Sequence, residues 1–421
     1  MNAVLNVHMH ERLAGQLRAD KQGKLVYQYD SGWLARHNAT PISLSLPMQE
    51  APFDNGEATA FFANLLPEAG QHTALARQLK TDNNNTFMML KAVAGECAGS
   101  IRLVPQRAKT GGTGSYRKLT DKTFDATLQA LTRQPLLVGR KGVRMSLAGT
   151  HCKLPVLLEE NAVASIPLDG APSNYILKPP RNDFNDSVEN EYFCMKLAAR
   201  MGLNVPAVVL LDKSTRVYAV ERFDRKTNKQ GRIFRLHQED FCQALGVLPE
   251  NKYEKDGGPS FQKCFDLVRY CSIQPVVDMQ ALLNWVVFNF LIGNEGIHAK
   301  NLSFYLTGQG PKLCPFYDLM STAVYPSLSY RMVMKIGGED RPNWLIKRRW
   351  QQFASDIGMN HKIVHQTLQK MSKSLLKHAN EEARKYYSQY GYCDIIDRIL
   401  GLIESRCQKV GRRLAATSGA K

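Results

Sequence analysis

The sequence predicts an α+β fold in which a strand-rich part precedes a helix-rich part. Before about residue 235, many short runs alternate apolar and polar residues, as half-buried strands do. After that point, apolar residues recur at helical spacing. The 421 residues are too many for one ordinary domain, so two or three packed units are expected.

The first hundred residues predict a small α/β unit. Alternating patterns predict strands at residues 3–9, 24–29 and 41–48. Helical patterns cover residues 57–66 and 86–94, and Pro67 stops the first of them. The stretch 110–115 is rich in Gly, Ser and Thr and is the best linker candidate.

The rest of the chain divides into short strands and then long helices. Strands are expected at residues 156–158, 175–177, 208–211 and 217–220. One helix, at residues 188–201, interrupts them. Later helices are expected at residues 264–271, 279–292, 363–376 and 394–403. This order is typical of a bilobal protein-kinase-like fold with an extra N-terminal α/β subdomain and an all-α C-terminal lobe.

Composition restricts the classes of function. With 44% hydrophobic residues the chain builds a large core. Its longest apolar run, residues 282–293, is shorter than the ~20 residues that span a bilayer, and no membrane partner is expected. The nine Cys have no CxxC spacing, which favours reduced thiols in a cytoplasmic protein without structural zinc.

The excess of basic residues indicates which kinds of partner the chain would bind. Lys and Arg outnumber Asp and Glu by 55 to 38, giving a net charge of +17. Such an excess favours nucleic acid or an acidic protein as a neighbour. A generally basic enzyme without such a partner is the alternative.

Three segments of the strand-rich part contain groups that can bind a nucleotide. Residues 144–153 read RMSLAGTHCK, where a small-residue turn lets backbone N–H groups approach phosphates and Lys153 adds charge. Lys178 ends a strand, where it can reach phosphate oxygens. Residues 220–225 read VERFDR and lie at the transition from strands to helices, where the hinge of a bilobal kinase meets adenine. An ordinary turn, a surface Lys and a charged strand end are the alternatives.

The strongest pattern lies at residues 293–318. Two short strands, 303–306 and 312–316, predict a hairpin around Gly308 and Gly310. A hairpin brings its open ends together, so Asn301 before it and Asp318 after it can converge. Their hard oxygen ligands are those with which protein kinases hold Mg²⁺. A plain hairpin with solvated polar ends is the alternative.

Taken in order, the motifs resemble the HipA family, the kinase component of bacterial toxin–antitoxin pairs. The resemblance covers nearly the whole chain and rests on PISLSLPM, FFANLLPE, GECAGS, SLAGTHCK, YILKPP, ENEYFCMKLAARMGLNVP, AVERFDR, RLHQEDFCQALG, KYEKDGGP, GNEGIHAKN and PFYD. It implies three parts, which are a HipA N-terminal subdomain at residues 1–108, a kinase N-lobe with the phosphate loop at 109–235, and a helical kinase C-lobe at 236–421.

The resemblance also implies roles for single residues. Asn301 and Asp318 would hold Mg²⁺, and Ser146 would be the autophosphorylated serine. Phosphate on Ser146 would add negative charge beside the loop that holds ATP phosphates and would expel that loop. The residues implied in ATP binding are Ala148, Gly149, Thr150, His151, Cys152, Lys153, Lys178, Glu221, Arg222, Phe223, His298, Lys300, Asn301, Tyr317 and Asp318.

One position departs from the family pattern. The family's catalytic loop usually reads Gly-Asn-x-Asp-x-His, and its Asp accepts the proton of the substrate hydroxyl. Here that position is Gly296, followed by His298. Loss of a general base costs roughly 10²–10⁴-fold in rate. Rescue by the neighbouring Glu295 requires its side chain to point toward the same place, which adjacent side chains seldom do.

Two functions follow as alternatives. In the first, the chain is a kinase toxin or its inactivated form, acting on a protein substrate, with glutamate-tRNA ligase as the family example. In the second, it is a pseudokinase that pairs with a HipB-like helix-turn-helix antitoxin and acts as corepressor on operator DNA. Candidate DNA contacts are Arg348, Arg349, Lys373 and Lys377. A small-molecule kinase of the same fold fits the N-terminal motifs less well.

Overall fold

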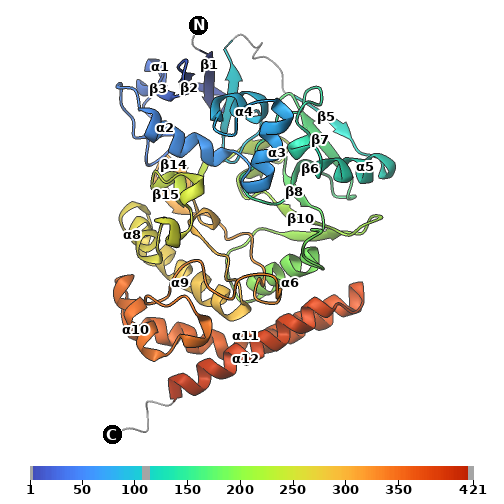
Figure 1. The fold of residues 1–421 in the computed structure, drawn as a ribbon, viewed down its shortest axis with the longest axis vertical. Coiled ribbons are helices and arrows are strands. Elements are labelled where there is room, and N and C mark those ends of the chain that lie inside the picture. Colours follow the sequence, from blue (N-terminus) through green and yellow to red (C-terminus); the bar gives the residue numbers. More distant parts are fainter. Residues whose placement is uncertain (1–2, 107–113, 416–421) are drawn as a thin grey trace. The chain divides into compact units, whose positions relative to one another are not determined.

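The computed structural model describes residues 3–106 and 114–415 (Figure 1). They form two compact units. The first comprises residues 3–106, 114–179, 210–250 and 303–314, and the second comprises residues 180–209, 251–302 and 315–415. The domain boundaries at residues 108 and 235 remain predictions, and residues 110–113 of the predicted linker lie outside the described residues.

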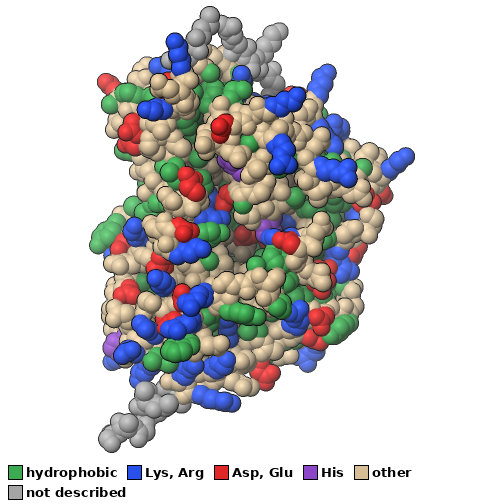
Figure 2. Space-filling view, in the orientation of Figure 1, with side chains coloured by type: hydrophobic (Ala, Val, Ile, Leu, Met, Phe, Trp, Pro, Cys, Tyr) green, Lys and Arg blue, Asp and Glu red, His purple; other side chains and the backbone are tan. Residues whose placement is uncertain are grey.

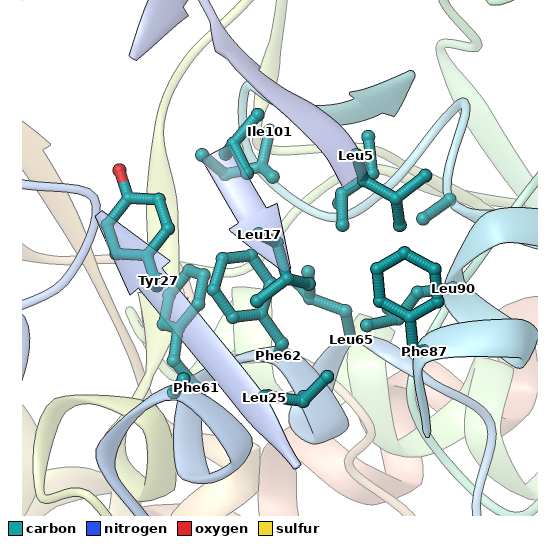
Figure 3. Packing of buried hydrophobic residues seen from close by; sticks show 14 of the residues in the cluster. Leu5, Leu17, Leu25, Tyr27, Phe61, Phe62, Leu65, Phe87, Leu90 and Ile101 are labelled. Atoms are coloured by element: carbon teal, nitrogen blue, oxygen red, sulfur yellow. The ribbon is translucent and has the colours of Figure 1, made fainter. Parts of the chain in front are cut away.

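The first unit begins with an antiparallel sheet of order β3-β2-β1-β4. Its strands are β1 (Ala3–Met9), β2 (Arg12–Ala19), β3 (Leu25–Tyr29) and β4 (Ile101–Pro105). The helices of this part are α1 (Ser31–Leu34), α2 (Asn55–Phe62), α3 (Ala69–Leu79) and α4 (Thr86–Val93). One face of the sheet and these helices enclose a hydrophobic core, which Figure 3 shows for Leu5, Leu17, Leu25, Tyr27, Phe61, Phe62, Leu65, Phe87, Leu90 and Ile101.

A six-stranded sheet of order β5-β7-β6-β8-β10-β9 follows in the same unit. Its strands are β5 (Ser115–Lys118), β6 (Leu154–Leu158), β7 (Ala164–Leu168), β8 (Tyr175–Lys178), β9 (Val208–Leu211) and β10 (Val217–Glu221). Helix α5 (Asp121–Leu131) adds Phe124 and Leu131 to the core beneath this sheet. The segments that are predicted to bind a nucleotide precede β6, end β8 and begin at the last residue of β10.

Two smaller sheets complete the first unit. One is a ribbon of β11 (Arg225–Thr227) and β12 (Ile233–Arg235). The other has the order β13-β14-β15 and consists of β13 (Gln238–Asp240), β14 (Ser303–Thr307) and β15 (Gly310–Leu313). The predicted hairpin is therefore confirmed, although its second strand ends at Leu313 and does not reach Phe316. Residues 236–421 are not entirely helical, because these three strands belong to that range.

The second unit is built from helices. They are α6 (Ser187–Arg200), α8 (Phe261–Cys271), α9 (Pro275–Ile292), α10 (Lys347–Asp356), α11 (His361–Tyr390) and α12 (Asp394–Ala415). Figure 1 shows α11 and α12 running side by side, and α9 packs against both. Among the described helices α9 alone is long and apolar enough to cross a membrane, but most of it is buried, as in the core helix of a globular unit. The short helices of the chain are α7 (Phe241–Ala244) and 3₁₀ turns at Ala63–Leu65, Pro135–Leu137, Pro249–Asn251, Glu254–Asp256, Ala299–Asn301 and Pro342–Trp344.

Most predicted elements are confirmed to within a few residues, but the strand at residues 41–48 is wrong. This segment makes a tight turn in which Ser43 bridges to Leu46. The alternation arose because Ile42 and Leu46 enter the core, while Ser43 turns inward as well and hydrogen bonds with buried Glu239. Residues 43 and 44 therefore hydrogen bond with the buried carboxylate of Glu239 and not with a neighbouring strand.

Glu239 predicts a pH-dependent stability. It is fully buried on β13, accepts hydrogen bonds from Ser43 Oγ and Leu44 N, and burial raises its pKa to about 8. The folded chain therefore holds one more proton than the unfolded chain between about pH 4.5 and 8. Its free energy of unfolding should fall by up to about 1.4 kcal/mol per pH unit as pH rises through that window.

The Glu239→Gln variant should remove this fall, because the amide does not ionise. Denaturant unfolding of both proteins at several pH values between 5 and 8.5 measures the difference. His237 also titrates, with a pKa that burial lowers to about 4, but it contributes equally to both proteins. Identical slopes for the two proteins would contradict the assignment.

Candidate functional site

The candidate phosphate loop, residues 146–153, is an open turn that leads into β6. Gly149 has φ +115°, which favours glycine, and a Cβ there would lie 2.6 Å from Lys153 Nζ. Lys153 folds back over the turn and donates to Ala148 O at 2.5 Å. Thr150 is exposed, while His151 and Cys152 are half-buried. Backbone and ammonium groups are thus gathered at one turn, and phosphate binding by it remains a prediction.

The N-terminal part of the first unit holds this loop. Ser146 is fully buried and its Oγ donates to Leu65 O at 2.5 Å. Its backbone N–H donates to Glu96 O at 2.8 Å, and Glu68 N donates to Gly149 O at 3.1 Å. Autophosphorylation of Ser146 therefore requires the loop to leave this position, since a buried hydroxyl cannot receive a phosphoryl group.

The other predicted nucleotide contacts lie on β8 and just after β10. Lys178 is buried and its Nζ lies 5.7 Å from the ring centroid of Tyr218. Glu221 is exposed, and the carbonyl of Phe223 accepts a hydrogen bond from Tyr305 at 2.7 Å. The side chain of Arg222 points inward, its N–H donates to Asn174 O at 2.8 Å, and its C=O accepts from Arg225 N at 3.1 Å. These assignments remain predictions.

Arg222 belongs to a buried charge cluster. It donates to both carboxylate oxygens of Asp224, at 2.9 and 2.7 Å, and to Glu96 at 3.3 Å. Arg225 and Arg235 donate to the same Glu96 at 2.8 and 2.7 Å. Burial alone would raise the pKa of Glu96, but the three guanidinium groups hold it far below its usual range. The cluster joins the turn at residues 95–100 to the segment after β10.

The loop at residues 293–298 follows α9 in the second unit. Gly293 ends the helix with φ +76°. Asn294 donates to Asn289 Oδ1 at 2.8 Å, which fixes the start of the loop. Gly296 is exposed, and a Cβ there would lie 3.8 Å from Thr322 Cγ2, an ordinary contact distance. A Cβ atom at this position therefore has room without movement of the backbone.

Glu295 is not oriented as a substitute base. Its side chain is 4% exposed and forms an ion pair with Arg406 of α12. Burial raises the pKa of Glu295, and Arg406 partly offsets that rise. Its backbone is also held, because its N–H donates to Thr322 Oγ1 at 2.8 Å and its C=O accepts from Val333 N at 2.9 Å. The carboxylate of Glu295 is thus directed toward α12 and held there.

Asn301 and Asp318 converge as predicted. Asn301 Nδ2 lies 3.3 Å from Asp318 Oδ2, while Asn301 Oδ1 accepts from His298 N at 3.0 Å. The Asn301 backbone N–H in turn donates to His298 O at 2.9 Å. Lys300 is buried, and its carbonyl accepts from Tyr317 Oη at 2.7 Å. The amide and carboxylate present hard oxygen ligands of the kind that suits Mg²⁺.

The predicted DNA contacts lie on the helices of the second unit. Figure 2 shows Lys and Arg side chains gathered over the part of this face that α10 to α12 occupy in Figure 1. Arg348, Lys373 and Lys377 are exposed. Arg349 instead lies 3.7 Å from Glu339 and donates to Gly337 O at 3.1 Å, so its charge is partly compensated within the unit.

Sequence reasoning missed three residues that shape these sites: Glu96, Glu239 and Arg406. Each is buried and charged, and each bonds a partner that lies more than 75 residues away in the sequence. Charged residues are seldom fully buried, yet no local pattern distinguishes those that are. Only a charged residue within an otherwise apolar stripe, as Arg406 is on α12, offers a signal.

Two family models match the chain. The model described as the HipA N-terminal domain matches residues 5–104, and the model described as the HipA-like C-terminal domain matches residues 145–379. The candidate phosphate loop, Gly296 and both Asn301 and Asp318 lie within the second match.

Relatives with similar sequences are named as kinases. A putative kinase of Sinorhizobium fredii is 39% identical over 371 residues, which cover 87% of this chain and 88% of that protein. The serine/threonine-protein kinase toxin HipA of Shewanella oneidensis is 29% identical over 387 residues, which cover 88% of this chain and 87% of that protein.

The fold is also found in a solved structure. A chain of the Shewanella oneidensis complex of HipA, HipB and operator DNA superimposes with a TM-score of 0.85 at 24% identity. The match covers 99% of this chain and 100% of that chain. The predicted bilobal kinase-like α+β fold is therefore confirmed.

The charge cluster predicts a large effect of removing Glu96. The Glu96→Ala variant leaves three buried arginines with Asp224 as their remaining buried carboxylate. We expect its free energy of unfolding to fall by about 3–5 kcal/mol, as when one partner of a buried ion pair is removed. Chemical denaturation measures the fall, and Glu50→Ala at an exposed position is the control, with an expected change below about 0.5 kcal/mol. Equal stability of both variants would refute this role.

Proposed function

The chain belongs to the HipA family, and we propose that it is the kinase component of a toxin–antitoxin pair, impaired because Gly296 replaces the catalytic aspartate. One observation carries the proposal. The loop at residues 293–298 is held on both sides of Gly296 by hydrogen bonds that do not involve that residue, and a Cβ there would make only an ordinary contact. The loop thus keeps the support that a catalytic residue needs.

ATP is the proposed phosphoryl donor. The turn at Ala148 to Thr150 and the ammonium groups of Lys153 and Lys178 would contact its phosphates, and the backbone of Glu221 to Phe223 would contact adenine. Both lysines belong to the unit that contains the phosphate loop. Preorganised donors of this kind supply most of the catalytic power in phosphoryl transfer.

Mg²⁺ is the proposed metal. Among the described residues there is no cluster of three or more His, Cys, Asp or Glu, so two protein ligands, Asn301 and Asp318, would hold the ion together with phosphate oxygens and water. When bound, Mg²⁺ neutralises charge that develops on the phosphates. Asn301 Oδ1 already accepts from His298 N, which orients the amide.

The step that Gly296 impairs is proton removal from the substrate hydroxyl. The neighbouring carboxylate does not replace the missing one, because Glu295 is paired with Arg406. Nucleotide and metal binding do not require the missing carboxylate. We therefore expect ATP binding with phosphoryl transfer slowed by roughly 10²–10⁴-fold.

The substrate and partners are proposed from the family. The substrate would be a protein of the translation apparatus, with glutamate-tRNA ligase as the example. The partner would be a HipB-like helix-turn-helix antitoxin, and the pair would bind operator DNA in the cytoplasm. The solved relative is itself part of a complex of HipA, HipB and operator DNA.

A second function, that of a corepressor without kinase activity, is favoured by one observation. Exposed cations, among them Arg348, Lys373 and Lys377, lie on helices of the second unit. Cations of this kind neutralise phosphates without reading bases. The loss of the catalytic aspartate does not affect such a role.

The kinase proposal predicts that Gly296→Asp restores autophosphorylation at Ser146. We expect labelling with Mg²⁺ and ATP to rise by about 10²–10⁴-fold over the unmodified chain, because the aspartate accepts the hydroxyl proton. Mass spectrometry locates the phosphate.

Two controls accompany this measurement. Gly296→Asn has the same shape without a basic carboxylate and should stay near the level of the unmodified chain. Adding Asp318→Asn to Gly296→Asp should abolish labelling through loss of Mg²⁺ binding. If Gly296→Asp binds ATP and yet labels nothing, the kinase proposal fails and the corepressor function is favoured.

The corepressor function predicts a salt-dependent contribution of α11 to DNA binding. In the complex with the antitoxin, Lys373→Glu with Lys377→Glu should weaken binding equally for operator and unrelated DNA. It should also reduce the slope of log K against log salt by about 2. The control reverses two exposed lysines of the first unit, Lys226→Glu with Lys229→Glu. Equal effects of both pairs would show only a general influence of net charge.

A further inference from the structure

Helix α12 carries three arginines that hold loops of the second unit. Arg398 donates to Val324 O, Arg406 to Phe290 O, and Arg413 to Leu345 O at 3.2 Å and Asn343 O at 2.7 Å. They are eight and seven residues apart, so all three lie on one face of the helix. Each guanidinium satisfies carbonyl groups that belong to no strand or helical ladder, apart from Phe290 O at the end of α9.

Arg406 differs from the other two in its partners. It bonds both the last turn of α9 and the carboxylate of Glu295, on either side of Gly293. Its side chain is 10% exposed and that of Glu295 is 4% exposed. The guanidinium therefore ties the end of the helix to the loop, with two partners in a fixed planar geometry.

Glu295 is also the residue of this loop that is held from three directions. Its side chain meets Arg406, its N–H meets Thr322, and its C=O meets Val333. The next residue, Gly296, has no side chain to hold it. On its N-terminal side the backbone of Gly296 is therefore positioned by Glu295, while the His298 N–H bond to Asn301 holds the other side.

A buried ion pair is weak evidence of a stabilising role, because the cost of desolvating both charges offsets their attraction. Replacing such a pair with apolar residues of similar size often leaves the stability of a protein unchanged or raises it. An apolar pair, however, would not fix the orientation of the residue 295 side chain, because apolar contacts have no preferred direction. The bonds of Arg406 fix the Glu295 side chain on the side of α12, away from the exposed position of Gly296.

We propose that Glu295 and Arg406 are positioning residues that set the catalytic loop from the C-terminal helix. This inference rests on the proposed kinase function and names what holds the loop when residue 296 is an aspartate. It explains why Glu295 sits next to the base position without replacing the base. A 1 Å displacement of a reacting group can cost about a hundredfold in rate, so loss of this pair affects turnover more than nucleotide affinity.

The first test needs no kinase activity. In the full chain as it stands, Arg406→Met should speed hydrogen exchange at the Glu295 and Val333 amides by about tenfold or more, because both bonds depend on the position of Glu295. Arg413→Met, which removes contacts to the carbonyls of Leu345 and Asn343 near the C-terminal end of α12, should leave these amides unchanged. Unchanged exchange in Arg406→Met would overturn the proposal.

The second test uses the Gly296→Asp background. There Arg406→Met should lower kcat by about 10- to 100-fold while the KM for ATP changes less than about twofold. Arg406→Lys should recover part of the loss, and Arg413→Met should keep kcat. An equal loss of kcat in Arg406→Met and Arg413→Met at matched thermal stability would overturn the positioning role.

The proposal can still be tested if Arg406→Met does not fold or if Gly296→Asp is inactive. If Arg406→Met does not fold, Glu295→Gln replaces it, since the amide oxygen keeps one weaker bond to Arg406 and should give a smaller rise in exchange. An unchanged exchange rate there counts against the proposal. If Gly296→Asp has no activity, the kinase function fails, and the exchange measurement still decides whether Arg406 sets the loop.

Discussion

The carboxylate of Glu96 is the interaction on which the first unit depends. It meets three guanidinium groups, from Arg222, Arg225 and Arg235, while its backbone pairs with the strand-like stem before the candidate phosphate loop. One residue thus joins the N-terminal sheet, the phosphate loop and the segment after β10. Because the whole cluster is buried, its charges must remain paired, and the three elements cannot shift independently.

The second unit uses a similar device at a different place. There Arg406 reaches from α12 to the end of α9 and to Glu295, and it fixes the loop that contains Gly296. In both units a buried arginine satisfies backbone carbonyls and a carboxylate at once. Guanidinium suits this use because its donors diverge in one plane and it stays charged when buried.

The hydrogen bonds around Gly296 are in place although residue 296 has no side chain. The loop is bonded to Thr322 and Val333, and Asn301 lies beside Asp318 at the open end of the hairpin. In the proposed kinase site, the carboxylate at position 296 is therefore the missing group, and the proposed DNA binding with an antitoxin would not need that carboxylate.

Periodicity and motif order were enough to determine the element types, the hairpin with its converging Asn301 and Asp318, and the family. These are local properties, since a repeat of two or of 3.6 residues records which face of an element is buried. Tertiary structure alone decided that residues 41–48 turn toward Glu239 instead of forming a strand, that Arg222 points inward, and that Glu295 faces Arg406. The partners in these contacts are 195, 126 and 111 residues apart, and a charged residue carries no local sign of the distant partner that lets it be buried.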